Sequence, residues 1–348
     1  MTKKITIAID AMGGENSPNK TIEGTCLFIK KNYSKNDFLI RLFGDKKKIE
    51  KELLRYGKIK NLEIIHTDSS VSDEETPLTA IKNSKNTSMW KCINSQIESD
   101  SDISLSAGNT GVLLVISRMI LKTMSEVKKP ALAGLWPNQK GTNVVLDLGA
   151  NIECDDENLI DFAELGAALY KSIYPNDKPQ VSLLNIGSEE IKGTETLKKA
   201  FKKLNTLSND NNLIFKGYIE GNKIMDGDTN VIVTDGFTGN IALKTAEGTA
   251  KFITDNLKSS LTSSLISKIS LIFSYFSLKK FKEKLDPRKF NGAIFLGLNG
   301  PVVKSHGSTD SYGFYHSIDL CYKIIKGSLM LKLKSNLNHI KDLKNAEK

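Results

Sequence analysis

The sequence is poor in the residues that build disulfide frameworks and zinc sites. It has four histidines and four cysteines, and the cysteines lie far apart without CxxC spacing: Cys26, Cys92, Cys154 and Cys321. We therefore expect neither a metal site nor a disulfide framework, and a reducing cytosol is the simplest compartment. Long apolar runs are also missing, because the most apolar stretch without a charge, Ile269–Leu278, is too short to cross a bilayer.

The motifs that bind nucleotides or activate a serine are absent as well. No two glycines lie two residues apart, which excludes the GxGxxG fingerprint, and no Gly-Lys pair is followed by Ser or Thr, which excludes the P-loop. The absence of GxSxG argues against an α/β-hydrolase. We therefore expect no cofactor.

Basic residues outnumber acidic ones, 49 to 40, which gives the 348-residue chain a net charge of +9. A positive excess favours acidic partners such as nucleic acid, an anionic membrane or an acidic protein. Many lysines are scattered, as at Lys46–Lys48, and scattered lysines usually form a solvated face. Because no basic block is interleaved with aromatic residues, we expect no nucleic acid partner.

Short apolar runs recur along the chain, and each ends in a glycine-bearing loop that leads into a helical pattern. The runs are Ile5–Ile9, Phe38–Phe43, Ile103–Leu105, Val144–Leu148, Val181–Ile186 and Val231–Val233. This alternation predicts an α/β fold with a mostly parallel sheet and crossover helices. Because no clean boundary or linker is present, we expect residues 1–348 to form a single domain, with a helical insertion near 250–285.

Two of the strand-to-helix loops share one pattern, with two glycines three residues apart and a threonine between them. They are SAGNTG at Ser106–Gly111 and DGFTGN at Asp235–Asn240. Glycine lets the backbone approach a ligand closely, and a helix start offers unpaired N–H groups and a positive dipole end. Such loops suit a phosphate or an oxyanion at the carboxyl ends of strands. The alternative is a tight turn without a ligand.

The stretch Gly292–Asp310 carries the richest set of polar groups beside predicted strands. Lysine, hydroxyl and imidazole groups arrive together at Lys304–Gly307, where a short strand ends. A site histidine and a structural histidine bonded to a backbone carbonyl both remain open on this pattern. Cys154 is better interpreted as a structural thiol than as a nucleophile, because no histidine lies near it in the sequence.

Several long strings in this order resemble the phosphate acyltransferase family. They are DAMGGE at Asp10–Glu15, SAGNTG at Ser106–Gly111, KPALAGLWP at Lys129–Pro137, LDLGAN at Leu146–Asn151, LLNIGSEEIKG at Leu183–Gly193, TDGFTGNIALKTAEG at Thr234–Gly248 and LDPRKFNGAIFLGLNGPVVKSHGSTD at Leu285–Asp310. The resemblance runs almost end to end, and it is far more specific than any single short motif.

The resemblance implies a three-layer α/β/α sandwich like that of the isocitrate and isopropylmalate dehydrogenases. It also implies a homodimer that converts long-chain acyl-[acyl carrier protein] and inorganic phosphate to acyl phosphate for phospholipid synthesis. Ionised phosphate is already a nucleophile and a thiolate leaves readily, so we expect direct attack without an acyl-enzyme.

The resemblance also suggests two sets of site residues, and no metal among them. We expect catalytic roles, in neutralising phosphate and stabilising the oxyanion, for Asn109, Lys192, Asp235, Lys304 and His306, with Asp235 orienting a lysine. We expect phosphate or substrate contacts from Asp10, Gly13, Gly14, Gly108, Thr110, Gly111, Asn151, Gly236, Thr238, Gly239, Asn240, Lys244, Asn299, Gly300, Ser305 and Gly307. Glu15 and Lys129 depart from the family's usual Asp and Arg, and Lys129 lacks bidentate phosphate geometry.

The segment Phe252–Phe281 has one apolar helical face and many lysines. We expect an amphipathic helix on an anionic membrane, with a break near Ser274–Ser277 and five side chains toward lipid: Leu265, Ile269, Ile272, Phe273 and Phe276. An equal alternative is that this apolar face is buried in a dimer interface. Both interpretations hold if a helical hairpin pairs across the dimer and presents its tip to lipid. The protein would then be cytoplasmic and peripherally bound to the inner face of the cell membrane, where a membrane glycerol-3-phosphate acyltransferase would use its product.

Three other functions remain open on the sequence. A phosphotransacetylase-like enzyme would share the phosphate loops but use a short acyl-CoA. A dehydrogenase of the isocitrate type would share the fold but require NAD and a metal. A membrane-bound scaffold for lipid enzymes would have no activity of its own.

Overall fold

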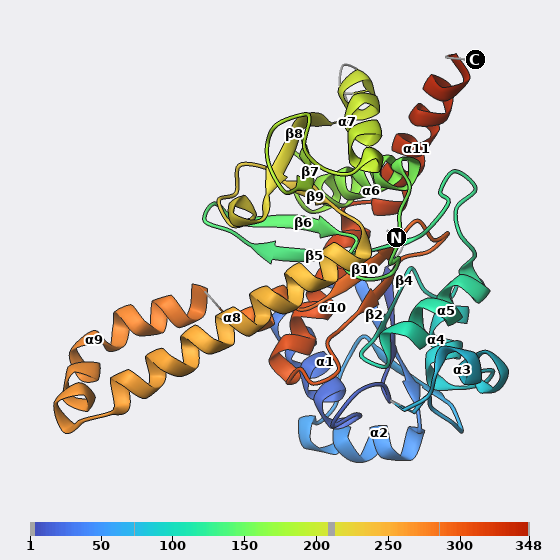
Figure 1. Ribbon diagram of the computed structural model, residues 1–348. Coiled ribbons are helices and arrows are strands. Elements are labelled where there is room, and N and C mark those ends of the chain that lie inside the picture. The colour runs from blue at the N-terminus through green and yellow to red at the C-terminus, as the bar shows by residue number, and fades with distance from the viewer. Residues whose placement is uncertain (1–3, 73, 208–212, 285, 347–348) are drawn as a thin grey trace.

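The computed structural model describes residues 4–72, 74–207, 213–284 and 286–346. Within these ranges, eleven strands form one sheet in the order β3-β2-β1-β4-β11-β10-β5-β6-β9-β7-β8 (Figure 1). In chain order they are β1 (Ile5–Asp10), β2 (Phe38–Gly44), β3 (Leu62–His66), β4 (Ile103–Ser106), β5 (Ala131–Pro137), β6 (Thr142–Leu146), β7 (Gln180–Asn185), β8 (Ile214–Glu220), β9 (Val231–Val233), β10 (Ala293–Leu296) and β11 (Val302–Lys304).

Two parallel blocks make up this sheet, and antiparallel strands join them. Strands β3, β2, β1, β4 and β11 are parallel to one another, and so are β6, β9, β7 and β8. Strand β10 is antiparallel to both β11 and β5, and β5 is antiparallel to β6. The second block therefore runs opposite to the first, and the carboxyl ends of the two blocks lie at opposite edges of the sheet.

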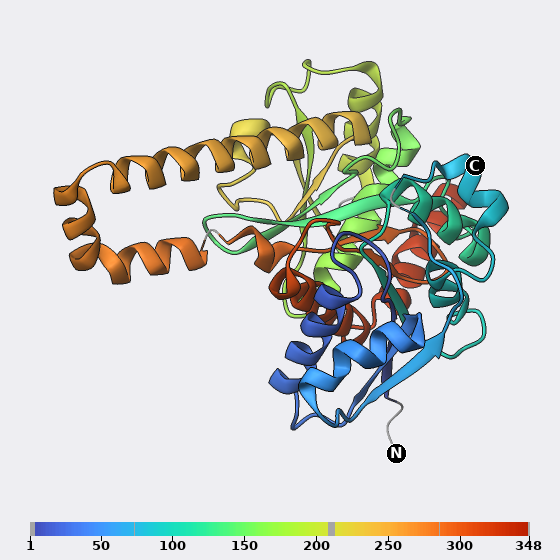
Figure 2. The same cartoon turned by 90° about the horizontal axis from the view of Figure 1, so that it is seen from below.

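Helices cover both faces of the sheet, which confirms the α/β/α sandwich (Figures 1 and 2). One face carries α1 (Asn19–Lys31), α2 (Lys46–Leu53), α6 (Asp156–Ile173), α7 (Glu195–Leu207), α10 (Ser311–Lys326) and α11 (Leu329–Ala346). The other carries α3 (Pro77–Asn83), α4 (Ser88–Asn94), α5 (Thr110–Leu121) and the first part of α8 (Gly236–Thr262).

Successive side chains along a strand point to opposite faces of the sheet, so the apolar core is divided between the two faces. In β9, Val231 and Val233 pack into the α1/α6/α10 side, while Ile232 between them packs into the α4/α5 side. All three side chains are fully buried. A continuous apolar run of this kind is typical of a parallel strand that is covered on both faces.

The long helix α8 leaves the body of the protein and forms a projecting arm, which we define as residues 250–284. Helix α9 (Leu265–Lys284) returns beside α8, and Figures 1 and 2 show the pair extending away from the sheet. The predicted helical insertion is therefore present, but its first helix begins at Gly236. The predicted break near Ser274–Ser277 is wrong, because α9 is continuous there and the chain turns between Thr262 and Leu265.

Candidate active site

Three loops meet at the edge of the sheet where β1, β4 and β11 end. Ser305 N–H donates to the Ser106 carbonyl at 2.9 Å, which joins the β11 and β4 loops. Glu15 N–H donates to the Gly307 carbonyl at 3.1 Å, which joins the β1 and β11 loops. Parallel pairing of β1 with β4 and of β4 with β11 brings the three loops together. We call residues 10–15, 106–111 and 304–307 the loop cluster.

Close backbone contact inside the loop cluster explains its glycines. A Cβ on Gly13 would lie 2.7 Å from the Gly108 nitrogen and 2.9 Å from Ser106 Oγ. Gly14 has φ +80°, and a Cβ there would lie 2.8 Å from the Ala107 carbonyl oxygen. Both positions therefore require glycine, so these residues shape the loops whether or not they contact a ligand.

Asp10 lies under the loop cluster, where it is only 1% exposed. Ser106 Oγ donates to its Oδ2 at 2.7 Å, and Met12 N–H donates to its Oδ1 at 3.2 Å. Burial raises the pKa of Asp10, and these hydrogen bonds oppose that effect. The carboxyl group of Asp10 therefore holds the β1 and β4 loops together, and its predicted substrate contact stays a prediction.

Asn109 is the N-cap of α5. Its Oδ1 accepts the N–H groups of Gly111 at 3.0 Å and of Val112 at 3.2 Å. This hydrogen bonding fixes the helix start, and Thr110 in the first turn is exposed. The structure therefore places Asn109 and Thr110 in the loop cluster, as the sequence analysis expected, with the Asn109 oxygen used for capping.

Lys304 and His306 lie in the same cluster. Lys304 Nζ donates to the carbonyl of Ala107 at 3.2 Å and to that of Ser305. Partial burial lowers the pKa of His306, and the positive charges of Lys304, Lys244 and Lys20 lower it further, while Glu247 opposes them. Because His306 Nδ1 accepts the Ser308 N–H at 3.3 Å, the neutral ring carries its proton on Nε2.

Asn291 holds the His306 segment in place. Its Nδ2 donates to Ser305 Oγ at 2.9 Å, and its Oδ1 accepts the His306 N–H at 3.0 Å. The two ends of one amide therefore fix two consecutive residues of the loop cluster. Asn291 was not among the predicted site residues, although it stands in the string LDPRKFNGA that carries the family resemblance.

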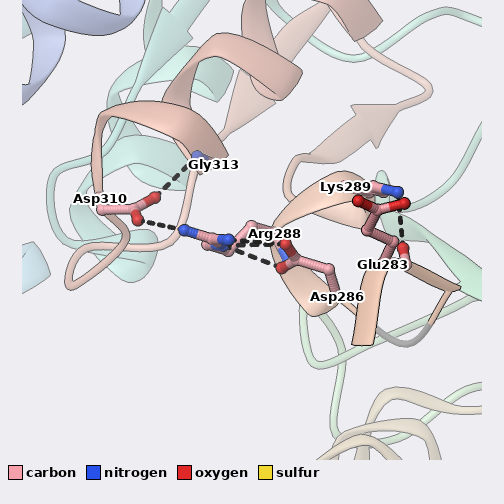
Figure 3. A network of polar contacts seen from close by, with 6 residues as sticks. All are labelled: Glu283, Asp286, Arg288, Lys289, Asp310 and Gly313. Atoms are coloured by element: carbon pink, nitrogen blue, oxygen red, sulfur yellow. Dashed lines mark hydrogen bonds and ion pairs between the residues drawn. The ribbon is translucent and has the colours of Figure 1, made fainter. Parts of the chain in front are cut away.

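Arg288 connects the end of the arm to the helix that follows the loop cluster (Figure 3). It forms a bidentate ion pair with Asp286 and a second pair, at 2.7 Å, with Asp310. Asp310 is also the N-cap of α10, where it accepts the Gly313 N–H at 2.9 Å. The guanidinium lies over the Tyr312 ring, 4.9 Å from its centroid. The short helix η3 (Pro287–Phe290) is thereby tied to α10.

A second cluster forms at the opposite edge of the sheet, after β6 and β9. The fully buried Asp147 accepts N–H groups of Leu132, Ala150 and Asn151 at 2.8–3.0 Å. The Asn151 side chain also donates to Asp147, at 2.8 Å, and to the Pro130 carbonyl at 2.8 Å. Burial raises the pKa of Asp147, which these hydrogen bonds partly offset.

The start of α8 packs against this second cluster. Gly236 N–H donates to the Asn151 carbonyl at 2.8 Å, and a side chain on Gly239 would collide with the Asp147 carbonyl. Asn240 Nδ2 donates to the Leu148 carbonyl at 3.2 Å. These glycines therefore seat a helix against a loop. A ligand contact for Asn151, Gly236, Gly239 or Asn240 stays a prediction.

Asp235 does not orient a lysine as the sequence analysis expected. It is the N-cap of α8, and Thr238 donates to its two oxygens through N–H and Oγ1, both at 2.8 Å. From this start α8 runs back over the sheet, and the charges of Lys244 and Glu247 act on His306. Lys244 and Glu247 are themselves paired at 2.8 Å. Helix α8 therefore links the two clusters.

Lys192, Asn299 and Gly300 belong to neither of the two clusters. Lys192, in the loop after β7, pairs with Glu189 at 2.8 Å. Asn299 and Gly300 precede β11, at the end of the strand opposite Lys304. Asn299 instead donates to the Leu121 carbonyl at 3.1 Å, and Gly300 packs against Gln96. A substrate contact of Asn299 or Gly300 stays a prediction.

The predicted membrane-facing residues lie in α9. The side chains of Leu265, Ile269 and Ile272 fall outside the described part of the chain. Phe273 and Phe276 are 86% and 82% exposed. Among the described residues, no helix combines the length and the apolar character needed to cross a bilayer.

Sequence reasoning missed Lys20 and Asp147 as well as Asn291. Lys20 is 4% exposed in the first turn of α1, and its ammonium donates to the Gly307 carbonyl. A lysine among many solvated lysines gives no signal of burial. Asp147 and Asn291 do lie in strings that carry the family resemblance. A polar residue among apolar ones suggests a buried polar group, and this pattern could have identified both.

The chain is similar to known proteins over almost its whole length. Residues 5–331 match a family model described as fatty acid synthesis protein. The chain is 54% identical to a phosphate acyltransferase of Pelagibacter ubique, over 97% of this chain and 100% of that protein. It is 41% identical to one from Parvibaculum lavamentivorans, over 99% of this chain and 94% of that protein. EutD phosphotransacetylase from Staphylococcus aureus shares the fold, with a TM-score of 0.59 at 15% identity, covering 93% of this chain and 94% of that one.

Proposed function

Because this chain belongs to the phosphate acyltransferase family, we propose that it transfers a long-chain fatty acyl group from acyl carrier protein to inorganic phosphate. The acyl phosphate product would enter phospholipid synthesis. The observation that carries the proposal is the 54% identity to a phosphate acyltransferase along that protein's entire length. The match to a fatty acid synthesis model supports a fatty acyl donor.

The loop cluster supplies the charges that this reaction needs. A phosphate oxygen attacks the thioester carbon, the C–S bond breaks, and the carrier thiolate leaves and takes a proton from water. The Lys304 ammonium, held by the Ala107 carbonyl, offsets the charge of phosphate. The neutral His306 ring has Nε2–H available as a donor to the tetrahedral oxyanion, since Nδ1 accepts from Ser308. Binding both reactants in one place supplies much of the rate enhancement.

An acyl-enzyme on Cys154 is disfavoured by the surroundings of its thiol. Burial and the nearby Asp147 raise the pKa of Cys154 to about 11, so that very little thiolate exists near pH 7. Its neighbours belong to the second cluster, at the edge opposite His306. Direct attack by phosphate therefore fits these residues better than a covalent intermediate.

The second candidate is a phosphotransacetylase-like enzyme that uses a short acyl-CoA. The fold shared with EutD phosphotransacetylase is the observation that favours it. To separate the two, palmitoyl-[acyl carrier protein] and acetyl-CoA are each incubated with phosphate and the protein, and acyl phosphate is measured by mass spectrometry. We expect product from the carrier-bound donor, and turnover of acetyl-CoA alone would overturn the proposal.

We also propose that the protein is a cytoplasmic homodimer bound peripherally to the inner face of the cell membrane. The exposed aromatic side chains of the arm support this proposal: Phe252, Phe273, Tyr275, Phe276 and Phe281. An acyl phosphate is amphiphilic, so delivery to a membrane glycerol-3-phosphate acyltransferase would be easiest at the bilayer surface. Lysines of the arm would add attraction to anionic lipid.

A further inference from the structure

Lys20 is a cation in a place where cations are costly. It lies in the first turn of α1, where the helix dipole disfavours positive charge, and it is 4% exposed. Burial of an ammonium group also costs free energy, because the charge loses its hydration by water. A leucine or methionine would fill the same space without either cost, so packing alone does not account for the lysine.

The Lys20 ammonium contacts two loops of the cluster at once. It donates to the Gly307 carbonyl, which also accepts the Glu15 N–H at 3.1 Å. A Cβ on Gly14 would lie 3.0 Å from Lys20 Nζ, so the ammonium is close against the backbone of the β1 loop. Lys304 makes a similar contact with the β4 loop, since its Nζ donates to the Ala107 carbonyl at 3.2 Å.

The charge of Lys20 also acts on His306. Lysines of three elements affect this ring: Lys20 of α1, Lys304 of β11 and Lys244 of α8; the carboxylate of Glu247 opposes them. A group of lysines around one exposed imidazole creates a positive potential. The electrostatic attraction of a doubly charged anion to this potential is about twice that of a singly charged one.

We propose that Lys20 is a positioning residue of the anion site: its ammonium ties the β11 loop to the β1 loop through the Gly307 carbonyl and supplies a fixed positive charge beside His306. This charge favours phosphate as its dianion. The inference rests on the proposed function in taking phosphate as the anion, and it adds a residue that the mechanism above does not use.

The test uses binding of inorganic phosphate, without any acyl donor. Lys20→Met should lower phosphate affinity roughly three- to tenfold at pH 8, where the dianion dominates, and by less at pH 6, measured by calorimetry. The His306 ring should titrate at higher pH in this variant, followed by NMR of the histidine nitrogens. Lys20→Arg keeps the charge and should restore both properties. Lys30→Met removes an exposed lysine of the same helix and should change neither.

A Lys20→Gln variant separates the two contributions and serves if Lys20→Met does not fold. It keeps a donor for the Gly307 carbonyl but loses the charge, so it should reproduce the pH-dependent loss of phosphate affinity. Unchanged phosphate affinity and an unchanged His306 titration in a folded, uncharged variant would overturn the proposal. If those changes occur while palmitoyl-[acyl carrier protein] gives no acyl phosphate, the acyl donor is wrong and the role of Lys20 stands.

Discussion

The position of His306 depends on a single amide side chain. Asn291 donates to Ser305 Oγ and accepts from the His306 N–H, so its side chain fixes both residues from the segment between η3 and β10. In contrast, Asn299 at the other end of the β10–β11 hairpin bonds to backbone carbonyls, such as that of Leu121, away from the loop cluster. The two asparagines make similar numbers of bonds but should differ in their effect on catalysis.

We therefore expect Asn291→Ala to lower kcat for acyl phosphate formation about tenfold or more, because His306 loses its alignment. Asn299→Ala is the matched control. It should lower the free energy of unfolding by about 1–2 kcal/mol but leave kcat near the wild-type value. Steady-state kinetics and urea unfolding of both variants check the difference. Equal kinetic losses in the two variants would show that Asn291 acts through stability alone.

Glu164 should make stability depend on pH near neutrality. It is 4% exposed in α6, and burial, with a smaller effect of Asp161, raises its pKa to about 7. Because the folded pKa lies above the unfolded one, the folded state binds the extra proton. The stabilisation is complete below about pH 4.5 and is lost as pH rises through about 7.

Replacement by glutamine removes this titration. We expect Glu164→Gln to be more stable than the wild type at pH 8 by about 2–3 kcal/mol, and similar to it at pH 5. Urea unfolding at several pH values between 5 and 8 measures the difference. A constant offset between the two proteins across this range would contradict the raised pKa.

At the scale of elements, Arg288 holds the short helix η3, which follows the arm in the chain, against α10. It joins Asp286, which precedes η3, to Asp310, the N-cap of α10 (Figure 3). Its guanidinium also lies over the Tyr312 ring. Lysine keeps the charge but cannot make the bidentate pair or the planar stacking contact. The same anchor lies next to Asn291 in sequence, so its loss should also reach the His306 loop.

We expect Arg288→Lys to speed amide hydrogen exchange at the first turn of α10 and in η3 by about tenfold, with smaller changes elsewhere. The fraction of exchange at each segment is followed by mass spectrometry. Arg118→Lys, an exposed arginine of α5, is the control and should leave these segments unchanged. Protection in η3 equal to that of the wild type would mean that the ion pairs do not hold η3 to α10.

The elements that the sequence predicted are those with continuous apolar runs. The predicted strands Ile5–Ile9 and Val231–Val233 match β1 and β9 within one residue. Edge strands β3 and β8 were missed, because one face of each is partly exposed and polar residues interrupt the pattern. The reversal of strand direction through β10 and β5 was also missed, because the residues of a strand do not show whether its neighbour is parallel or antiparallel. That reversal is why Asp235 and Asn109 ended at opposite edges of the sheet.

At the scale of the whole molecule, α8 has an inner part that packs on the sheet and an outer part that projects into the arm. The sequence did not show where one part ends and the other begins. Its first turn is fixed to the Asp147 loop, and the charges of Lys244 and Glu247 further along act on the pKa of His306, while residues 250–262 leave the body. The outer part exposes apolar side chains, with Phe252 69% and Leu257 37% exposed. The apolar surface of α9 is more exposed still, with Phe273 at 86%. Exposed apolar side chains in such number mark an interaction surface.

We expect these two surfaces to serve different partners. Phe252→Asp combined with Leu257→Asp should convert a dimer to a monomer, because a buried carboxylate opposes an apolar interface. Phe273→Glu combined with Phe276→Glu should leave the dimer intact but abolish binding to anionic vesicles, since apolar insertion is lost and two acidic groups are repelled. Analytical ultracentrifugation and vesicle co-sedimentation at low and high salt separate the two effects. Wild-type vesicle binding by a dimeric Phe273/Phe276 variant would remove the membrane role from α9, and a dimeric Phe252/Leu257 variant would remove the dimer role from α8.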